Sequence, residues 1–196
     1  MQPKGNGGGW NQGKVVGRMR PFTMRQVQII RSVLDEKKDF RGRALFEVGI
    51  SVALRAGDLL KLRVHDVMSL GEIIESFDVR QSKTGTVVTV DLMEDAVVAL
   101  KAYILAENMQ DGQRLFPIGR LRLSQIVKQW AEIAGADPRF YSTHSVRRTF
   151  PAHVYRETGK VEYSRQILGH SSSQNTSAYL GVEEIEVREV KKRFRM

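Results

Sequence analysis

Most of what this sequence predicts rests on His144-Ser145-Val146-Arg147, on Leu168-Gly169-His170, and on Tyr179 nine residues further along. Two histidines and an arginine can together bind and neutralise one phosphate. A tyrosine nearby offers an oxygen nucleophile, and its phenol, with a pKa of about 10, needs such neighbours to react at neutral pH. This set of residue types indicates a phosphodiester as the target.

Around this stretch the pattern is helical. A helix is predicted over 143–158, because Gly159 supplies a stop signal. Shorter helical pieces are predicted near 162–168 and 174–180. A charged helix is predicted over 183–194, where acidic residues come first and basic residues last, as the helix dipole favours.

The preceding part of the chain adds more helices and one hairpin. Thr23 can cap a helix with Val27, Ile30 and Val33 on one face, and 43–54 is apolar enough to be a buried helix. Two β-rich runs, 73–79 and 86–92, flank a turn at 82–85, which puts Lys83 at a hairpin tip. Further helices are predicted over 95–108 and 121–134. The expected class is α+β, mostly α-helical with a small antiparallel β-sheet.

Composition narrows the class of protein. The 196 residues include 31 Lys and Arg against 22 Asp and Glu, a formal charge of +9. Such an excess favours a polyanionic partner such as nucleic acid, although a basic protein without that function would look the same. The sequence has no cysteine, which excludes disulfides and Cys-based zinc sites and favours the cytoplasm, with nucleoid association in a prokaryotic or phage setting. No apolar run approaches the roughly 20 residues of a membrane span.

Residues 1–20 are rich in glycine and poor in apolar side chains. We therefore expect a flexible basic arm or a cloning remnant, with the folded domain over 21–196. Lys14, Arg18 and Arg20 of this arm are candidate contacts to DNA phosphates.

For two residues, Arg55 and Lys83, the sequence leaves open whether the role is structural or functional. Arg55 follows an apolar helix and precedes Asp58 by three residues, so its guanidinium either pairs with that carboxylate or awaits an anionic ligand. Lys83 is, taken alone, an ordinary solvated turn residue.

The region from Arg139 to His170 is basic. Arg139, Arg147 and Arg148 can bind phosphates, and His144 lies one turn from Arg147, although a basic face is more often simply solvated. The histidine spacing fits no common zinc pattern, so no metal is predicted. His65 and His153 are expected to be structural. Besides Tyr179, the candidate nucleophiles are Tyr141, Tyr155 and Tyr163.

The motifs resemble those of the tyrosine recombinases of the phage integrase family. In order and spacing they are Leu54-Arg55 with Asp58-Leu59, Ser82-Lys83-Thr84-Gly85, His144-Ser-Val-Arg147-Arg148-Thr-Phe150, and Leu168-Gly-His170-Ser-Ser with Tyr179. The resemblance covers about residues 21–182.

The resemblance implies an enzyme that cleaves and rejoins DNA strands through a 3′-phosphotyrosine link, without metal, cofactor or ATP. Tyr179 would be the nucleophile. The scissile phosphate would be held by Arg55, His144, Arg147 and His170, and Lys83 would protonate the leaving oxygen. Asp58 would hold Arg55 in position without contacting the phosphate itself.

Two departures from the family pattern stand out. Pro151 falls inside the helix that carries Arg147 and is expected to kink it. Most members also have a separate N-terminal domain that closes around DNA, which residues 1–20 could not form. The expectation is either a catalytic fragment of a longer enzyme or a short, single-domain recombinase.

The implied partners are double-stranded DNA, three further copies of the chain in a tetramer on paired sites, and possible accessory DNA-bending proteins. The helix over 183–194, with Val187, Val190 and Phe194 on one face, is expected to dock either on its own domain or on a neighbouring copy. The reaction would serve integration, excision or inversion of DNA. The alternatives are a type IB topoisomerase and a non-catalytic DNA-binding protein on the same scaffold.

Overall fold

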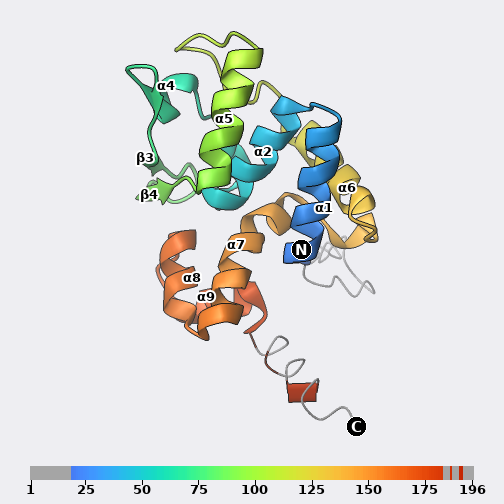
Figure 1. The fold of residues 1–196 in the computed structure, drawn as a ribbon. Helices are drawn as coiled ribbons and strands as arrows, with labels where there is room; N and C mark the ends of the chain where they lie inside the picture. Colours follow the sequence, from blue (N-terminus) through green and yellow to red (C-terminus); the bar gives the residue numbers. More distant parts are fainter. Residues whose placement is uncertain (1–18, 183–185, 187–189, 192–196) are drawn as a thin grey trace, which may run out of the picture.

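The computed structural model describes residues 19–182 together with Glu186, Val190 and Lys191 (Figure 1). Lys14 and Arg18 of the predicted basic arm, and most of the helix predicted over 183–194, lie outside these residues. In the described part of the chain, no helix is both long enough and apolar enough to cross a bilayer.

The described residues form helices and four short strands. The longer helices are α1 (Met24–Glu36), α2 (Phe40–Ser51), α5 (Glu94–Ala106), α6 (Arg120–Ile133) and α7 (Thr143–Thr158). The shorter ones are α3 (Ala56–Leu59), α4 (Val64–Val67), the 3-10 turn η1 (Pro138–Phe140), α8 (Val161–Leu168) and α9 (Ser173–Leu180). The strands are β1 (Met68–Ser69), β2 (Glu72–Ile73), β3 (Ser76–Arg80) and β4 (Val87–Asp91). The predicted α+β class with mainly helical content is confirmed.

The hairpin differs from its prediction in one respect. Ile73 does not continue into β3 but pairs with Met68 in a separate two-stranded sheet, β1–β2. Leu70 and Gly71 have positive φ angles there, which closes a tight turn and makes the second small sheet possible. The larger hairpin pairs β3 with β4 in antiparallel register, with Ser76 opposite Asp91, and its turn carries Lys83 as predicted.

Helix α2 lies at the centre of the fold and packs against α1, α5 and α7 (Figure 1). It begins earlier than predicted because the Asp39 carboxylate caps it by accepting a hydrogen bond from the Gly42 amide. It also ends earlier, at Ser51, because Ala53 adopts a left-handed backbone conformation with φ of 46°. This bend leads the chain from the buried helix to Arg55.

A second, smaller hydrophobic cluster lies beneath α8 and α9. It contains Ala53, Ala152, Tyr155, Leu168, Leu180 and Val182. Helix α7 connects this cluster to the main core and runs on through Pro151, whose carbonyl accepts a hydrogen bond from the Ser164 hydroxyl at 2.8 Å. Figure 1 shows α8 and α9 together at one end of the molecule, away from α5.

Candidate active site

A pocket of about 450 Å³ lies where α3, the hairpin turn, α6 and the start of α7 meet. Its lining residues are Arg55, Ala56, Gly57, Asp58, Ser82, Lys83, Arg120, Thr143, His144 and Arg147. Four of these are arginine or lysine and one is histidine, so the pocket suits an anion.

Arg55 enters the pocket from the start of α3. Its guanidinium donates a hydrogen bond to the side-chain oxygen of Gln81, a residue buried at the end of β3. Of the two alternatives left open for Arg55, the structure shows no bond to Asp58 among the described residues and a bond to Gln81 in its place. Holding the guanidinium from one side leaves its other N–H groups available to a ligand.

Asp58 is buried and supports the hairpin instead. Its carboxylate accepts hydrogen bonds from the backbone amide of Ser82 at 3.0 Å and from the Ser82 hydroxyl at 2.5 Å. These bonds fix the turn that presents Lys83, and the predicted role of Asp58 in positioning Arg55 stays a prediction. Lys83 itself is exposed at the rim of the pocket.

The first turn of α7 supplies His144 and Arg147. A capping box between Ser142 and Ser145 starts this helix. Arg147 is buried and donates to the Leu168 carbonyl at 2.9 Å, while its Nε has no hydrogen-bond partner among the described residues. Burial lowers the pKa of Arg147. A buried cation with an unused donor beside a pocket is suited to binding an anion.

Loss of hydration lowers the pKa of His144, and the positive charges of Arg147 and Arg148 lower it further. The same causes act on His170, where burial, followed by the charges of Arg147 and Arg55, lowers the pKa to about 4. Both rings are consequently neutral at pH 7, so each can donate one hydrogen bond and accept another.

His170 is placed by the end of α8 and the start of α9. Gly169 ends α8 in a left-handed conformation, and the ring Nδ1 of His170 lies 3.1 Å from the Thr176 hydroxyl. This contact occupies one ring nitrogen and leaves Nε2 for another partner.

Tyr179 lies beside His170 and Arg147. Its ring meets the His170 ring edge to face, with centroids 5.4 Å apart, and the guanidinium carbon of Arg147 is 5.9 Å from its centroid. The Tyr179 hydroxyl is buried and has no hydrogen-bond partner among the described residues. Tyr179 does not line the pocket, so the hydroxyl has to turn before it can reach a ligand there.

The other tyrosines are placed differently. Tyr141 bonds Gln26, the Tyr155 hydroxyl donates to Glu186 at 2.5 Å, and Tyr163 is exposed on α8. Among the candidates, Tyr179 is the one in contact with His170 and Arg147. Tyr179 therefore stays the predicted nucleophile.

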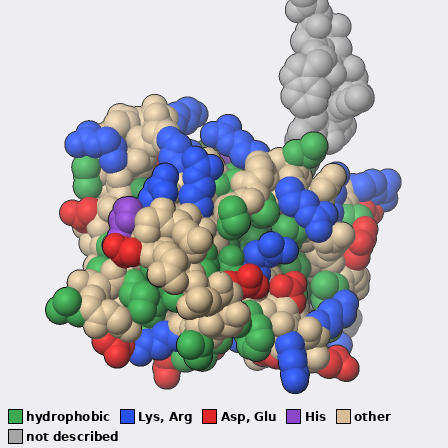
Figure 2. All heavy atoms as spheres, turned by 90° about the horizontal axis from the view of Figure 1, so that it is seen from above, with side chains coloured by type: hydrophobic (Ala, Val, Ile, Leu, Met, Phe, Trp, Pro, Cys, Tyr) green, Lys and Arg blue, Asp and Glu red, His purple; other side chains and the backbone are tan. Residues whose placement is uncertain are grey.

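The predicted DNA contacts of the described residues are dispersed. Arg148 is buried, and its predicted contact with DNA stays a prediction. Arg139 is exposed and paired with Asp137 at 2.6 Å, and Arg20 lies over the Phe140 ring at 4.1 Å. Seen from above, the charged side chains in the upper half of the surface in Figure 2 are mainly Lys and Arg.

His153 has the structural role expected of it, since its Nε2 lies 2.9 Å from the Phe22 carbonyl oxygen. The sequence interpretation missed Arg120 and Gln81. Arg120 is the first residue of α6 and packs over Gly57, which has no side chain to obstruct it. The only sequence signal for Arg120 was its place at a helix start, directly after Gly119. Among the described residues, no three His, Asp or Glu side chains are grouped as metal ligands.

Comparisons with known proteins identify the family of the chain. The model of the phage integrase family matches residues 21–185, and the chain belongs to that family. It is similar to the probable integrase/recombinase YoeC of Bacillus subtilis, with 27% identity over 88% of this chain and 94% of YoeC. It is also similar to the tyrosine recombinase XerD of Xanthomonas axonopodis pv. citri, with 29% identity over 74% of this chain and 52% of that protein.

Solved structures show the same fold. The crystal structure of XerA recombinase matches 92% of this chain and 66% of its own, with a TM-score of 0.71 and 24% identity. The XerH site-specific recombinase, solved with a palindromic difH substrate after cleavage, matches 81% of this chain and 48% of its own, with a TM-score of 0.67 and 17% identity. The chain therefore spans nearly all of YoeC but about half the length of XerD and XerH.

Proposed function

We propose that this chain acts in site-specific DNA recombination, in which it cleaves and rejoins strands through a 3′-phosphotyrosine intermediate. The observation that carries this proposal is the pocket in which Arg55, Lys83, His144 and Arg147 converge, with Tyr179 and His170 immediately beside it. Family membership and the DNA-bound structure of XerH support it.

In the proposed step the phenolic oxygen of Tyr179 attacks phosphorus, and the bond to the 5′-oxygen breaks. The phenolic proton passes to a neighbouring base, and the candidate is the His170 ring, which lies edge to face with the Tyr179 ring. Lys83 gives a proton to the leaving 5′-oxygen. The two arginines stabilise the charge on the phosphate oxygens, a role that metal ions hold in many nucleases.

The reverse attack by a 5′-hydroxyl of another strand would complete an exchange, because the phosphotyrosine bond conserves the energy of the broken phosphodiester. Exchange between two sites requires several copies of the chain together. We therefore include a homo-tetramer on paired DNA sites in the proposal, with accessory bending proteins as further partners.

The test is covalent capture of DNA. A nicked duplex carrying the target site should become joined to the protein in excess EDTA, and Tyr179→Phe should abolish the joined species while DNA binding persists. Tyr163→Phe is the matched control, because Tyr163 is an exposed tyrosine on the neighbouring helix, and it should leave the yield unchanged. An equal yield from Tyr179→Phe would contradict the proposal.

A further inference from the structure

Arg148 contacts the ring of Tyr179 more closely than its neighbour Arg147 does. Its guanidinium carbon lies 4.5 Å from the centroid of the ring, whereas that of Arg147 lies at 5.9 Å. The Arg148 side chain is 6% exposed and does not line the phosphate pocket. A cation held over an aromatic face in a desolvated place restrains the ring by attraction to its negative face.

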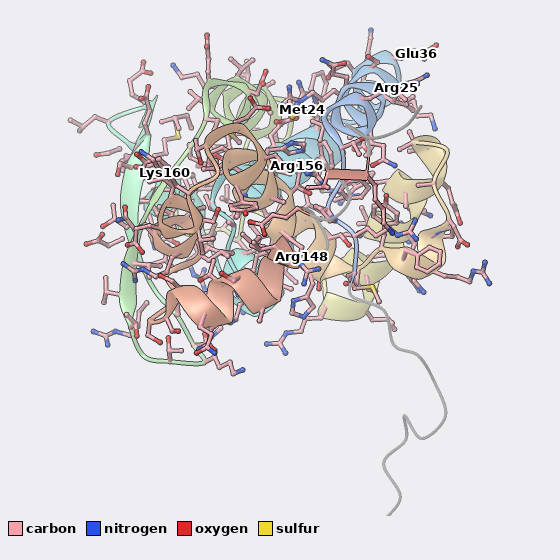
Figure 3. All side chains as sticks on the ribbon, turned by 90° about the horizontal axis from the view of Figure 1, so that it is seen from below. Met24, Arg25, Glu36, Arg148, Arg156 and Lys160 are labelled. Atoms are coloured by element: carbon pink, nitrogen blue, oxygen red, sulfur yellow. The ribbon has the colours of Figure 1, made fainter. Side chains whose placement is uncertain are left out.

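A second described contact of this guanidinium is with the segment that enters the domain. Arg148 donates a hydrogen bond to the Met19 carbonyl at 2.5 Å. Figure 3, seen from below, shows Arg148 beside α9, the helix that carries Tyr179. One side chain therefore touches both the nucleophile and the start of the described chain.

The entry segment, residues 19–22, is attached to α7 at two further points. The Phe22 amide donates to the Thr149 hydroxyl at 3.1 Å, and the Phe22 carbonyl oxygen lies 2.9 Å from Nε2 of His153. Thr149 directly follows Arg148. Because the segment is fixed beside Arg148, the position of its backbone sets where the guanidinium lies.

We propose that Arg148 is a positioning residue, which holds the ring of Tyr179 and couples its placement to the segment entering the domain at Met19. The inference rests on the proposed role of Tyr179 as nucleophile. A displaced ring would slow attack while leaving DNA affinity intact, since misplacing a reacting group by about 1 Å can cost about 10²-fold in rate.

The first test replaces the guanidinium. Arg148→Gln keeps a hydrogen-bond donor for Met19 but removes the cation over the ring, and we expect the rate of covalent capture at saturating DNA to fall at least ~10-fold. Arg148→Lys restores a cation and should recover part of that rate. The dissociation constant and its salt slope should not change. Arg156→Gln, an exposed arginine further along α7, is the matched control and should behave as the parent (Figure 3).

Other outcomes separate the possible explanations. If Arg148→Gln weakens binding, reduces the salt slope by about one and leaves the saturated rate unchanged, Arg148 contacts a phosphate and the proposal is wrong. An unchanged rate and affinity also overturn it. Unfolding curves of each variant show whether a slow rate reflects loss of the fold. If Arg148→Gln is unfolded, the capture rate of Arg148→Lys tests the proposal in its place, and a folded Arg148→Lys variant with no part of the parent rate would overturn it. If the parent captures no DNA, the proposed function itself fails.

The second test addresses the coupling. Thr149→Val removes the acceptor of the Phe22 amide and should slow capture at saturating DNA by loosening the entry segment. If the segment acts through Arg148, the double variant with Arg148→Gln should be no slower than Arg148→Gln alone. If the fold decreases in capture rate of the two single variants multiply in the double variant, the segment does not act through Arg148.

Discussion

His170 is kept neutral by its surroundings, and this has a consequence for stability. Its pKa falls from an ordinary value of 6.5 to about 4, first through burial and then through Arg147 and Arg55. Between these values the unfolded chain binds a proton that the folded chain does not, so the free energy of unfolding decreases as pH falls through this window and is unaffected by His170 above it. We predict that His170→Gln loses less stability than the parent between about pH 7 and pH 5, measured by urea unfolding.

The same loss in both proteins would contradict this prediction. His144 also has a lowered pKa, so the His170 variant should keep part of the acid sensitivity. His65→Gln, which removes a histidine on α4 away from the pocket, is the control.

Lys83 lies at the pocket rim on a turn that Asp58 anchors through Ser82. A proton donor matters most when the leaving oxygen is poor, so Lys83→Ala should slow cleavage of ordinary DNA by about 10²-fold or more. A substrate with a sulfur leaving group needs little protonation and should be cut almost as fast as by the parent. Lys61→Ala is the control, because Lys61 also contacts Ser82 but does not line the pocket. Equal slowing of both substrates by Lys83→Ala would show that it holds DNA instead.

At the scale of the elements, the end of α8 is packed tightly against the hairpin. Gly169 has φ of 60°, and a Cβ there would lie 2.6 Å from a methyl carbon of Val88. Gly169→Ala should therefore lower the free energy of unfolding by roughly 2–5 kcal/mol and shift His170, which reduces cleavage.

Gly159, at the end of α7, is the matched control for this substitution. It has nearly the same φ, 68°, but a Cβ there would meet nothing within 4 Å. Gly159→Ala should cost only the backbone strain of about 1–2 kcal/mol and leave cleavage intact. Similar losses in the two variants, compared by denaturant unfolding, would show that the packing against the hairpin is unimportant.

Elements with local signals could be predicted from the sequence, and those set by distant contacts could not. Helix α7 has the predicted bounds because Ser142 caps it and Gly159 ends it, and both signals lie within the segment. The bend at Ala53 has no local signal, since alanine rarely adopts a left-handed conformation. The residue types of the site were predictable from motif spacing, but the inward turn of Arg148 and the bond from Arg55 to Gln81 depend on segments that meet only in the folded chain.

At the scale of the whole molecule, the end of the chain bears on assembly. Glu186 accepts the hydrogen bond of Tyr155, yet the side chain of Val190 is 51% exposed. We predict that truncation after Val182 leaves a folded, DNA-binding protein that assembles poorly into tetramers, because it removes the apolar side chains that we expect to dock on a neighbouring copy. Light scattering of the protein on DNA measures this, and normal tetramers would show that subunit contacts lie elsewhere.

The small cluster beneath α8 and α9 is separate from the main core, so we expect the two regions to differ in local stability. Tyr179 belongs to the smaller one, which contains Leu168, Leu180 and Val182 and is separate from the main core. Regions with few apolar contacts open without unfolding of the rest, so backbone amides of α9 should exchange with deuterium much sooner than those of α2. We therefore expect the proposed nucleophile to lie in a region that can rearrange without unfolding of the main core, which would bring its buried hydroxyl to the phosphate.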